Sequence, residues 1–90
     1  MNDAFIKKCK GYINEGDLSG LQLCYIDVQG LDLGYSLNWE YIYHRIYLHA
    51  CLKKKRHIVN WLTSIFTSFD VVSQIGLRQI FPYGRYLLAK

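Results

Sequence analysis

Residues 38–52 read NWEYIYHRIYLHACL and carry the clearest helical pattern in the chain. Asn38 can cap the start of such a helix, and Glu40 lies in the first turn, where the helix dipole favours an anion. Apolar residues recur every three or four positions, which is typical of one buried helix face. They are Trp39, Ile42, Tyr43, Ile46, Tyr47 and Ala50.

A second helix is predicted after a short basic turn. The turn is Lys53-Lys54-Lys55-Arg56, and cations are favourable beside the unpaired carbonyls at a helix C-terminus. Residues 56–66 then carry a second apolar stripe, formed by Ile58, Val59, Leu62, Ile65 and Phe66. The pattern predicts a helix pair over residues 38–66.

Another helix pair is predicted over residues 3–26. Gly16 ends its first helix, because glycine takes the left-handed conformation that closes a helix at little cost. Asp17 then caps a second, shorter helix. The apolar stripe of the first helix consists of Phe5, Ile6, Cys9, Tyr12 and Ile13, and that of the second of Leu18, Leu21 and Tyr25.

The segment between the two pairs, residues 27–37, loses the helical period. Apolar and polar residues alternate from Leu31 to Asn38, which is typical of a strand or an extended loop. We expect an extended finger at residues 27–37. The alternative is a β-hairpin near residues 21–37, which would make the fold α+β. An isolated hairpin is marginal in water, and no third strand is predicted downstream.

The C-terminal segment, residues 68–90, has a weaker pattern. Ser68 or Asp70 can cap a short helix, and Pro82 biases the residue before it toward an extended conformation. We expect this segment to cap the two helix pairs. Residues 1–90 then form a single all-α domain.

Composition limits the class of protein. The chain has 90 residues, of which 51% are hydrophobic and 16% aromatic, and this excludes a disordered chain. The longest apolar runs are too short to span a bilayer, and the N-terminus lacks the pattern of a secretory signal. We expect a globular protein of the cytoplasm or nucleus, without membrane contact.

Charge is divided unevenly between the two halves. Residues 1–43 contain three lysines and six acidic residues, for a net charge of −3, whereas residues 44–90 contain eight Lys or Arg and one Asp, for +7. Such asymmetry can attract an acidic partner to the C-terminal half.

The sequence carries no pattern for catalysis or cofactor binding. Cys9, Cys24 and Cys51 form no CxxC pair and have apolar neighbours, so we interpret them as small buried hydrophobic residues. The spacing of Cys51 and the histidines matches no recurring zinc site, and the seven acids are scattered. We expect a non-enzymatic protein with no cofactor or metal.

The two helix pairs align with each other as a repeat. Setting Gly16 against Lys54 places Ile13 on Cys51, an offset of 38 residues. Tandem helix pairs are typical of a solenoid, in which no unit buries its apolar face alone.

Residues 48–62, LHACLKKKRHIVNWL, resemble the core of an ankyrin repeat, which begins Leu-His-x-Ala and continues after a polar turn with Ile-Val-x-x-Leu. Residues 16–18 are similar to its turn, and residues 27–36 to its inter-repeat finger. The Thr-Pro-Leu-His block is absent, Lys54 occupies the usual turn glycine, and the period is a few residues longer. The resemblance implies about two stacked antiparallel repeats plus a C-terminal partial unit. Such divergent repeats are similar to those of short proteins of large DNA viruses, such as the asfarvirus multigene families.

The resemblance implies a protein–protein interaction module, in the viral case an accessory protein that engages a host factor. Tyr41 and Arg45, with Leu48, lie off the buried stripe, and tyrosine and arginine are favoured interface anchors. The alternative function is weak nucleic-acid binding through the basic turn. The simpler interpretation of the basic turn is that its cations are solvated and bind no partner. The cations concerned are Lys53, Lys54, Lys55 and Arg56.

Self-association is the last expectation. Two helix pairs and a partial unit fall below the roughly three repeats that such stacks need for stability. The chain is also rich in bulky aromatic residues, which one thin layer of helices can hardly bury. We expect a symmetric homodimer in which residues 65–88 pack against their copy. A tail that folds back onto its own chain is the alternative.

Overall fold

The computed structural model describes residues 2–30 and 38–90. These residues form six α-helices and no strand, so the predicted all-α class is confirmed. None of the six is long and apolar enough to cross a membrane. The helices are α1 (Asn2–Glu15), α2 (Leu18–Gly30), α3 (Trp39–Leu52), α4 (Arg56–Phe66), α5 (Val71–Leu77) and α6 (Ile80–Ala89).

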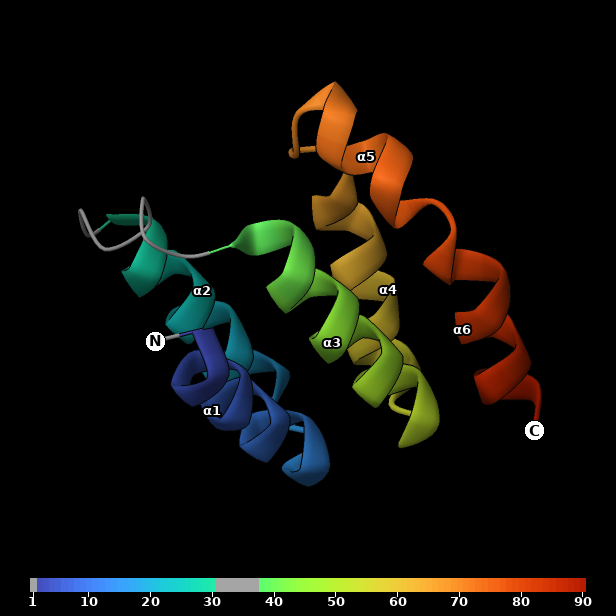
Figure 1. Ribbon diagram of the computed structural model, residues 1–90. Helices are drawn as coiled ribbons and strands as arrows, with labels where there is room; N and C mark the ends of the chain where they lie inside the picture. Colours follow the sequence, from blue (N-terminus) through green and yellow to red (C-terminus); the bar gives the residue numbers. More distant parts are fainter. Residues whose placement is uncertain (1, 31–37) are drawn as a thin grey trace.

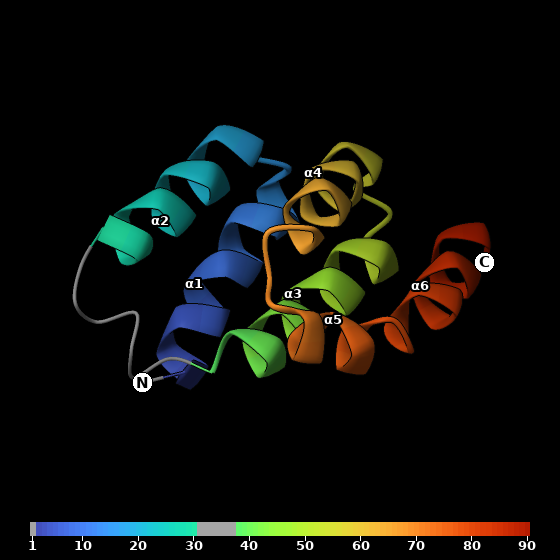
Figure 2. The same ribbon diagram turned by 90° about the horizontal axis from the view of Figure 1, so that it is seen from above.

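Helix α3 is the central element of the fold. Figures 1 and 2 show α3 between α1 and α6, with α2 behind α1 and α4 behind α3. Helix α3 packs against α1, α4, α5 and α6. The helix with the clearest sequence pattern is therefore the central packing element, and its Trp39 also meets Tyr25 of α2.

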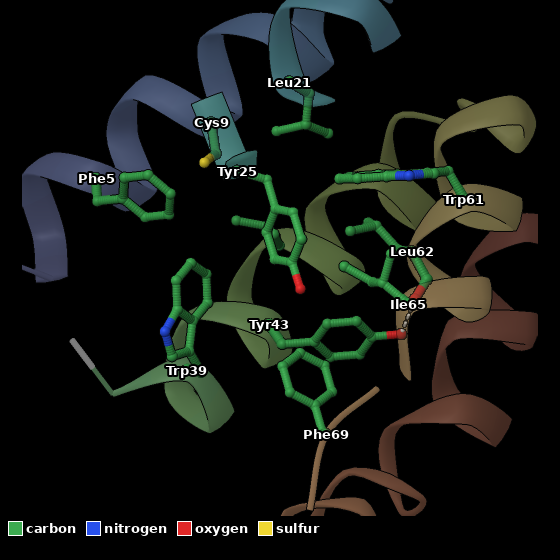
Figure 3. Close-up of a pocket in the computed structure, with 11 residues that line it drawn as sticks. Phe5, Cys9, Leu21, Tyr25, Trp39, Tyr43, Trp61, Leu62, Ile65 and Phe69 are labelled. Carbon is green, nitrogen blue, oxygen red and sulfur yellow. Dashed lines mark hydrogen bonds between the residues drawn. The ribbon is translucent and has the colours of Figure 1, made fainter. Parts of the chain in front are cut away.

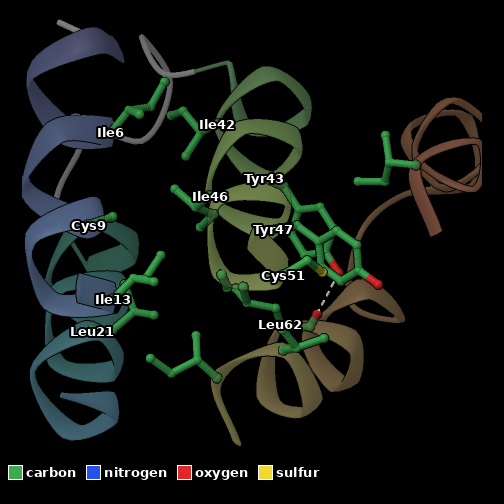
Figure 4. Close-up of a cluster of buried hydrophobic side chains, with 14 of the residues drawn as sticks. Ile6, Cys9, Ile13, Leu21, Ile42, Tyr43, Ile46, Tyr47, Cys51 and Leu62 are labelled. Carbon is green, nitrogen blue, oxygen red and sulfur yellow. Dashed lines mark hydrogen bonds between the residues drawn. The ribbon is translucent and has the colours of Figure 1, made fainter. Parts of the chain in front are cut away.

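The buried side chains form one cluster around α3 (Figure 4). No buried polar or charged residue is found among the described residues. The predicted buried stripe of α3 is confirmed, with Trp39 partly buried at its start, and the three cysteines are buried as predicted. The cluster comprises Ile6, Cys9, Ile13, Leu21, Cys24, Ile42, Tyr43, Ile46, Tyr47, Ala50, Cys51, Ile58, Val59, Leu62, Leu77 and Ile80.

Three predicted N-caps are present. The side-chain oxygens of Asp17, Asn38 and Asp70 accept hydrogen bonds from backbone N–H groups three residues ahead. The distances are 2.9 Å for Asp17 to Gly20, 3.1 Å for Asn38 to Tyr41 and 2.8 Å for Asp70 to Ser73. Each cap satisfies one of the unpaired N–H groups that open a helix, and so sets where the helix begins.

The prediction of an extended finger at residues 27–37 is wrong for residues 27–30. Helix α2 continues through Gly30, so its length exceeds the predicted end at residue 26. The β-hairpin near residues 21–37 is wrong for the same reason, since its first strand would fall within α2. Once a helix is nucleated, each further residue adds a hydrogen bond, whereas a lone hairpin has no such support. Residues 31–37 lie outside the described part.

The turns of the two helix pairs match at an offset of 38 residues. Gly16 has φ 70° and Lys54 has φ 58°, both left-handed. The N–H groups of Gly16 and Lys54 each donate at 3.0 Å to the carbonyl three residues back. The N–H of the next residue, Asp17 or Lys55, donates to the carbonyl five residues back, at 2.9 and 3.0 Å. Both helices therefore end in the same Schellman motif, and the predicted alignment of Gly16 with Lys54 is confirmed at this turn.

Because Lys54 adopts a conformation that disfavours a side chain, we expect Lys54→Gly to be more stable than Lys54→Ala by about 1 kcal/mol. Both variants lose the lysine ammonium, so their difference reports the backbone alone. Thermal melting followed by circular dichroism measures it, at roughly 4–8 °C per kcal/mol for a chain of this size. Equal melting temperatures would show that residue 54 is not held in the left-handed region.

An aromatic cluster fills the space between the two helix pairs (Figure 3). Trp39 meets Phe5 and Tyr25 edge-on, with ring centroids 5.7 and 5.5 Å apart, and Tyr25 meets Trp61 in the same way at 5.6 Å. The cavity left among these side chains is about 10 Å³, about the space of one water. The cluster therefore packs α1 and α2 against α3 and α4 and leaves no room for a ligand.

The C-terminal segment folds back onto its own chain. The Phe81 ring lies 5.2 Å from that of Tyr47 and 4.8 Å from that of Phe66, and the Phe69 ring lies 5.3 Å from that of Tyr43. The bulky aromatic residues on which the expected dimer depended, Trp39, Trp61, Phe66, Phe69 and Phe81, all pack partly buried against the core. The C-terminal segment thus packs on its own chain, and the homodimer expected from the sequence stays a prediction.

Candidate functional site

The basic turn makes contacts within the chain. The Lys54 ammonium donates hydrogen bonds to the carbonyls of Leu87 and Leu88 at 3.5 and 3.3 Å, at the C-terminal end of α6. Lys55 is half-buried, and its ammonium lies beside Gly16, 3.7 Å from where a Cβ would stand. A cation beside the last carbonyls of a helix is favourable. Two of the four predicted cations thus join the turn to the neighbouring helix units.

His57 adds a further link from this turn to the first helix pair. Its ring nitrogen Nε2 lies 3.1 Å from the carbonyl oxygen of Gly16, to which it donates. Lys53 and Arg56 are exposed on either side of the two engaged lysines. The turn is therefore partly structural, and a role for its cations in binding a partner stays a prediction.

Tyr41 and Arg45 lie on the solvent-facing side of α3, as predicted. Both are exposed, and Leu48 on the same stripe is half-buried. Leu52 continues the stripe by one more turn and is 58% exposed. Positions 41, 45, 48 and 52 are spaced by three or four residues, so they share one face of the helix.

Two adjoining hollows lie along this face of α3, with volumes of about 280 and 360 Å³. We call the face from Tyr41 to Leu52, together with both hollows, the α3 groove. Arg45 lines the first hollow, Tyr41 the second, and His44 lines both. The first is formed by Lys10, His44, Arg45, Leu48, His49, Leu52, Tyr83 and Leu87, and the second by Asn38, Glu40, Tyr41, His44, Gly76 and Leu77.

The first hollow combines an apolar floor with a cationic rim. Leucines of α3 and α6 supply the floor, while Lys10 of α1 and Arg45 of α3 supply positive charge. None of the residues that line it is acidic. The second hollow contains one carboxylate, that of Glu40. The groove is thus amphipathic, and its positive charge is concentrated toward the C-terminal end of α3.

His49 is held in place at the edge of the first hollow. Its Nε2 lies 2.7 Å from Oδ1 of Asn14 on α1, to which the ring donates. Burial lowers the pKa of His49 below its ordinary value, and the charges of Lys10 and Lys53 lower it further. His49 is therefore neutral at pH 7, and Lys10 and Arg45 carry the charge of the rim.

Sequence reasoning missed the residues that α1 and α6 contribute to the groove. Lys10, Tyr83 and Leu87 are distant in sequence from α3 and reach the first hollow only through the fold. Leu52 could have been found, because it follows Leu48 by four residues on the stripe already selected. The basic turn and the α3 face are separate sites: of the turn residues, none lines either hollow.

The buried thiols are poor candidates for chemistry. Burial raises the pKa of Cys9 to about 12, with Cys24 beside it contributing, and burial also raises the pKa of Cys51. A thiol protonated at neutral pH is a weak nucleophile. In the described ranges, no three His, Cys, Asp or Glu side chains are grouped so that they could hold a metal ion.

Comparison with known proteins returns no relative. The chain matches no family model, and the searches of curated proteins and of solved structures find no match.

Proposed function

We propose that this protein is a non-enzymatic protein–protein interaction module whose binding surface is the α3 groove. The observation that carries the proposal is the composition of this surface: leucine, tyrosine and arginine side chains of α3 and α6 converge there with Lys10 of α1, and Leu52, Tyr83 and Arg45 among them are exposed. Aromatic residues and arginine are enriched at protein interfaces, around an apolar centre with a polar rim.

The ankyrin resemblance is part of this proposal. The matching turns at Gly16 and Lys54 support two repeated helix pairs, with α5 and α6 as a modified cap. On this view the protein acts in the cytoplasm or nucleus, and its viral character, as an accessory protein that engages a host factor, belongs to the proposal as well.

Nucleic-acid binding through the basic turn is the less favoured function. Lys54 donates to carbonyls at the end of α6, and the Lys55 ammonium lies beside Gly16 in the turn between α1 and α2. Of the four cations of the basic turn, Lys53 and Arg56 are then the two that face outward. Two cations neutralise few phosphates, and affinity for nucleic acid scales with that number.

Site-specific photocrosslinking tests the interaction surface. A photoreactive amino acid at Arg45 or Leu52 is expected to form adducts with a partner in the cells where the protein acts, because both side chains are exposed in the groove. The same probe at Ser64, which is exposed on α4 and lines neither hollow, is the matched control.

Equal adduct formation at Arg45 and Ser64, or none at either, would contradict the proposed surface. An adduct of twice the chain's own mass, formed from the groove positions alone, would identify the partner as a second copy. That result would support the homodimer expected from the sequence, through the α3 groove, to which Tyr83 and Leu87 of the C-terminal segment contribute.

A further inference from the structure

The α3 groove has the length of a short helix. Helix α3 contains 14 residues, so it extends about 21 Å. The two hollows follow one another along it and share His44. An elongated groove along a helix suits a partner segment that lies parallel or antiparallel to α3, as in helix-in-groove recognition.

The floor of the first hollow requires apolar side chains from its occupant. Leu48, Leu52 and Leu87 line it, and Leu52 is 58% exposed. Covering such surface yields roughly 25 cal/mol per Å² of apolar area removed from water. An occupant with apolar residues three and four positions apart would meet these leucines with one helical face.

The cationic rim of the first hollow favours an occupant with negative charge. Lys10 of α1 and Arg45 of α3 both line the first hollow, and no carboxylate lines it. Arginine also binds carboxylates through two parallel hydrogen bonds. The carboxylate of Glu40, in the second hollow, repels acidic residues at the other end.

We infer that the α3 groove binds an acidic amphipathic helical segment of a partner protein. The inference deepens the proposed function and rests on it. The apolar face of the segment covers Leu48, Leu52 and Leu87. Its carboxylates flank that face and pair with Lys10 and Arg45, and its end nearest Glu40 carries no acid.

Nucleic acid fits this groove less well than such a segment does. A duplex offers regularly spaced phosphates and no apolar side chains to cover the leucines of the floor. The α6 wall of the hollow also presents Tyr83, which is 54% exposed and stacks on Tyr86 with ring centroids 6.2 Å apart. Tyrosine pairs are suited to apolar side chains at a protein interface.

Binding of designed peptides tests the inference directly. The first peptide has about 14 residues, with leucines on one helical face, glutamates on both flanks and no acid in its last turn. The second has the same composition in an order that destroys the apolar face. Fluorescence anisotropy with the full chain is expected to show about tenfold tighter binding of the first peptide.

Two substitutions separate the floor from the rim. Leu52→Gln removes exposed apolar surface, and Arg45→Glu reverses a rim charge, and each is expected to weaken the first peptide about tenfold. Arg56→Glu, which makes the same charge change at an exposed residue outside the groove, is the control and is expected to change the affinity less than about twofold.

Equal affinity for the two peptides would overturn the inference, because it would show that the groove binds both peptides by non-specific electrostatic attraction. Tighter binding of a duplex oligonucleotide, weakened by Arg56→Glu, would overturn it in favour of the basic turn. Photocrosslinks confined to the groove but lying on a non-acidic partner segment would leave the proposed function standing and reject the inference alone.

Discussion

Replacing Gly84 with alanine is expected to loosen α6 from α3 and to lower the free energy of unfolding by about 1–3 kcal/mol, the usual cost of overpacking. Gly84 is buried where α6 crosses α3. A Cβ at this position would stand 2.6 Å from Cε1 of Tyr47 and 3.0 Å from Sγ of Cys51. Both neighbours are buried core side chains, so relief requires α6 to move away.

Gly11→Ala provides the matched control for Gly84→Ala. Gly11 also lies within a helix, but nothing is within 4 Å of the added Cβ. Alanine in an open helical position is more favourable than glycine by about 1 kcal/mol. The same substitution is therefore expected to stabilise the chain at residue 11 and to destabilise it at residue 84, as measured by urea unfolding.

The reactivity of Cys51 reports the movement of α6 independently of stability. Cys51 has no exposed surface when α6 is in place. In Gly84→Ala it is expected to react faster with a thiol reagent under native conditions, while Cys9 stays protected in the α1–α2 hairpin. Unchanged reactivity together with unchanged stability would mean that α6 does not pack on α3 through Gly84.

Helices with a strong apolar period and a capping residue were predictable from sequence. Helix α3 begins at Trp39 after Asn38 and buries the stripe that its period indicates. Local sequence features determine this helix, since the cap, the first-turn Glu40 and the apolar spacing all favour it. Gly16 likewise ends α1 where its left-handed conformation was expected.

The end of α2 was not predictable in this way. Asp27 and Gly30 are poor helix formers, and the alternating pattern after them favours an extended chain. Helix propagation nevertheless carries α2 to Gly30, because the preceding turns, with Leu21 and Cys24 buried in the core cluster, are already fixed.

The candidate site was predictable only in the part that a single helix supplies. Tyr41 and Arg45 could be selected because they lie off the buried stripe of α3. Lys10 and Leu87 could not, because their approach to α3 depends on how α1 and α6 dock. The contacts of Lys54 with the end of α6 were unpredictable for the same reason, since they join residues 33 and 34 positions apart in the sequence.

Replacing Tyr43 with alanine is expected to unfold most of the protein at room temperature. Tyr43 is 1% exposed and stacks on Tyr47, with ring centroids 5.7 Å apart, and its ring meets Phe69 edge-on. Removing a buried aromatic side chain costs about 3–5 kcal/mol. The total free energy of unfolding of a small domain is of about the same size as this cost, so the variant retains little stability.

Tyr43→Phe separates the packing of this ring from its hydrogen bond. The hydroxyl of Tyr43 donates to the carbonyl of Leu62 at 2.7 Å, and burial raises the pKa of Tyr43, so the donor proton is retained at all physiological pH values. Phenylalanine keeps the ring contacts and loses this one bond, which is worth about 1 kcal/mol. Urea unfolding should therefore place Tyr43→Phe close to the unmodified chain and Tyr43→Ala far below it. If the two variants were equally destabilised, the hydrogen bond to Leu62 rather than ring packing would hold α3 against α4.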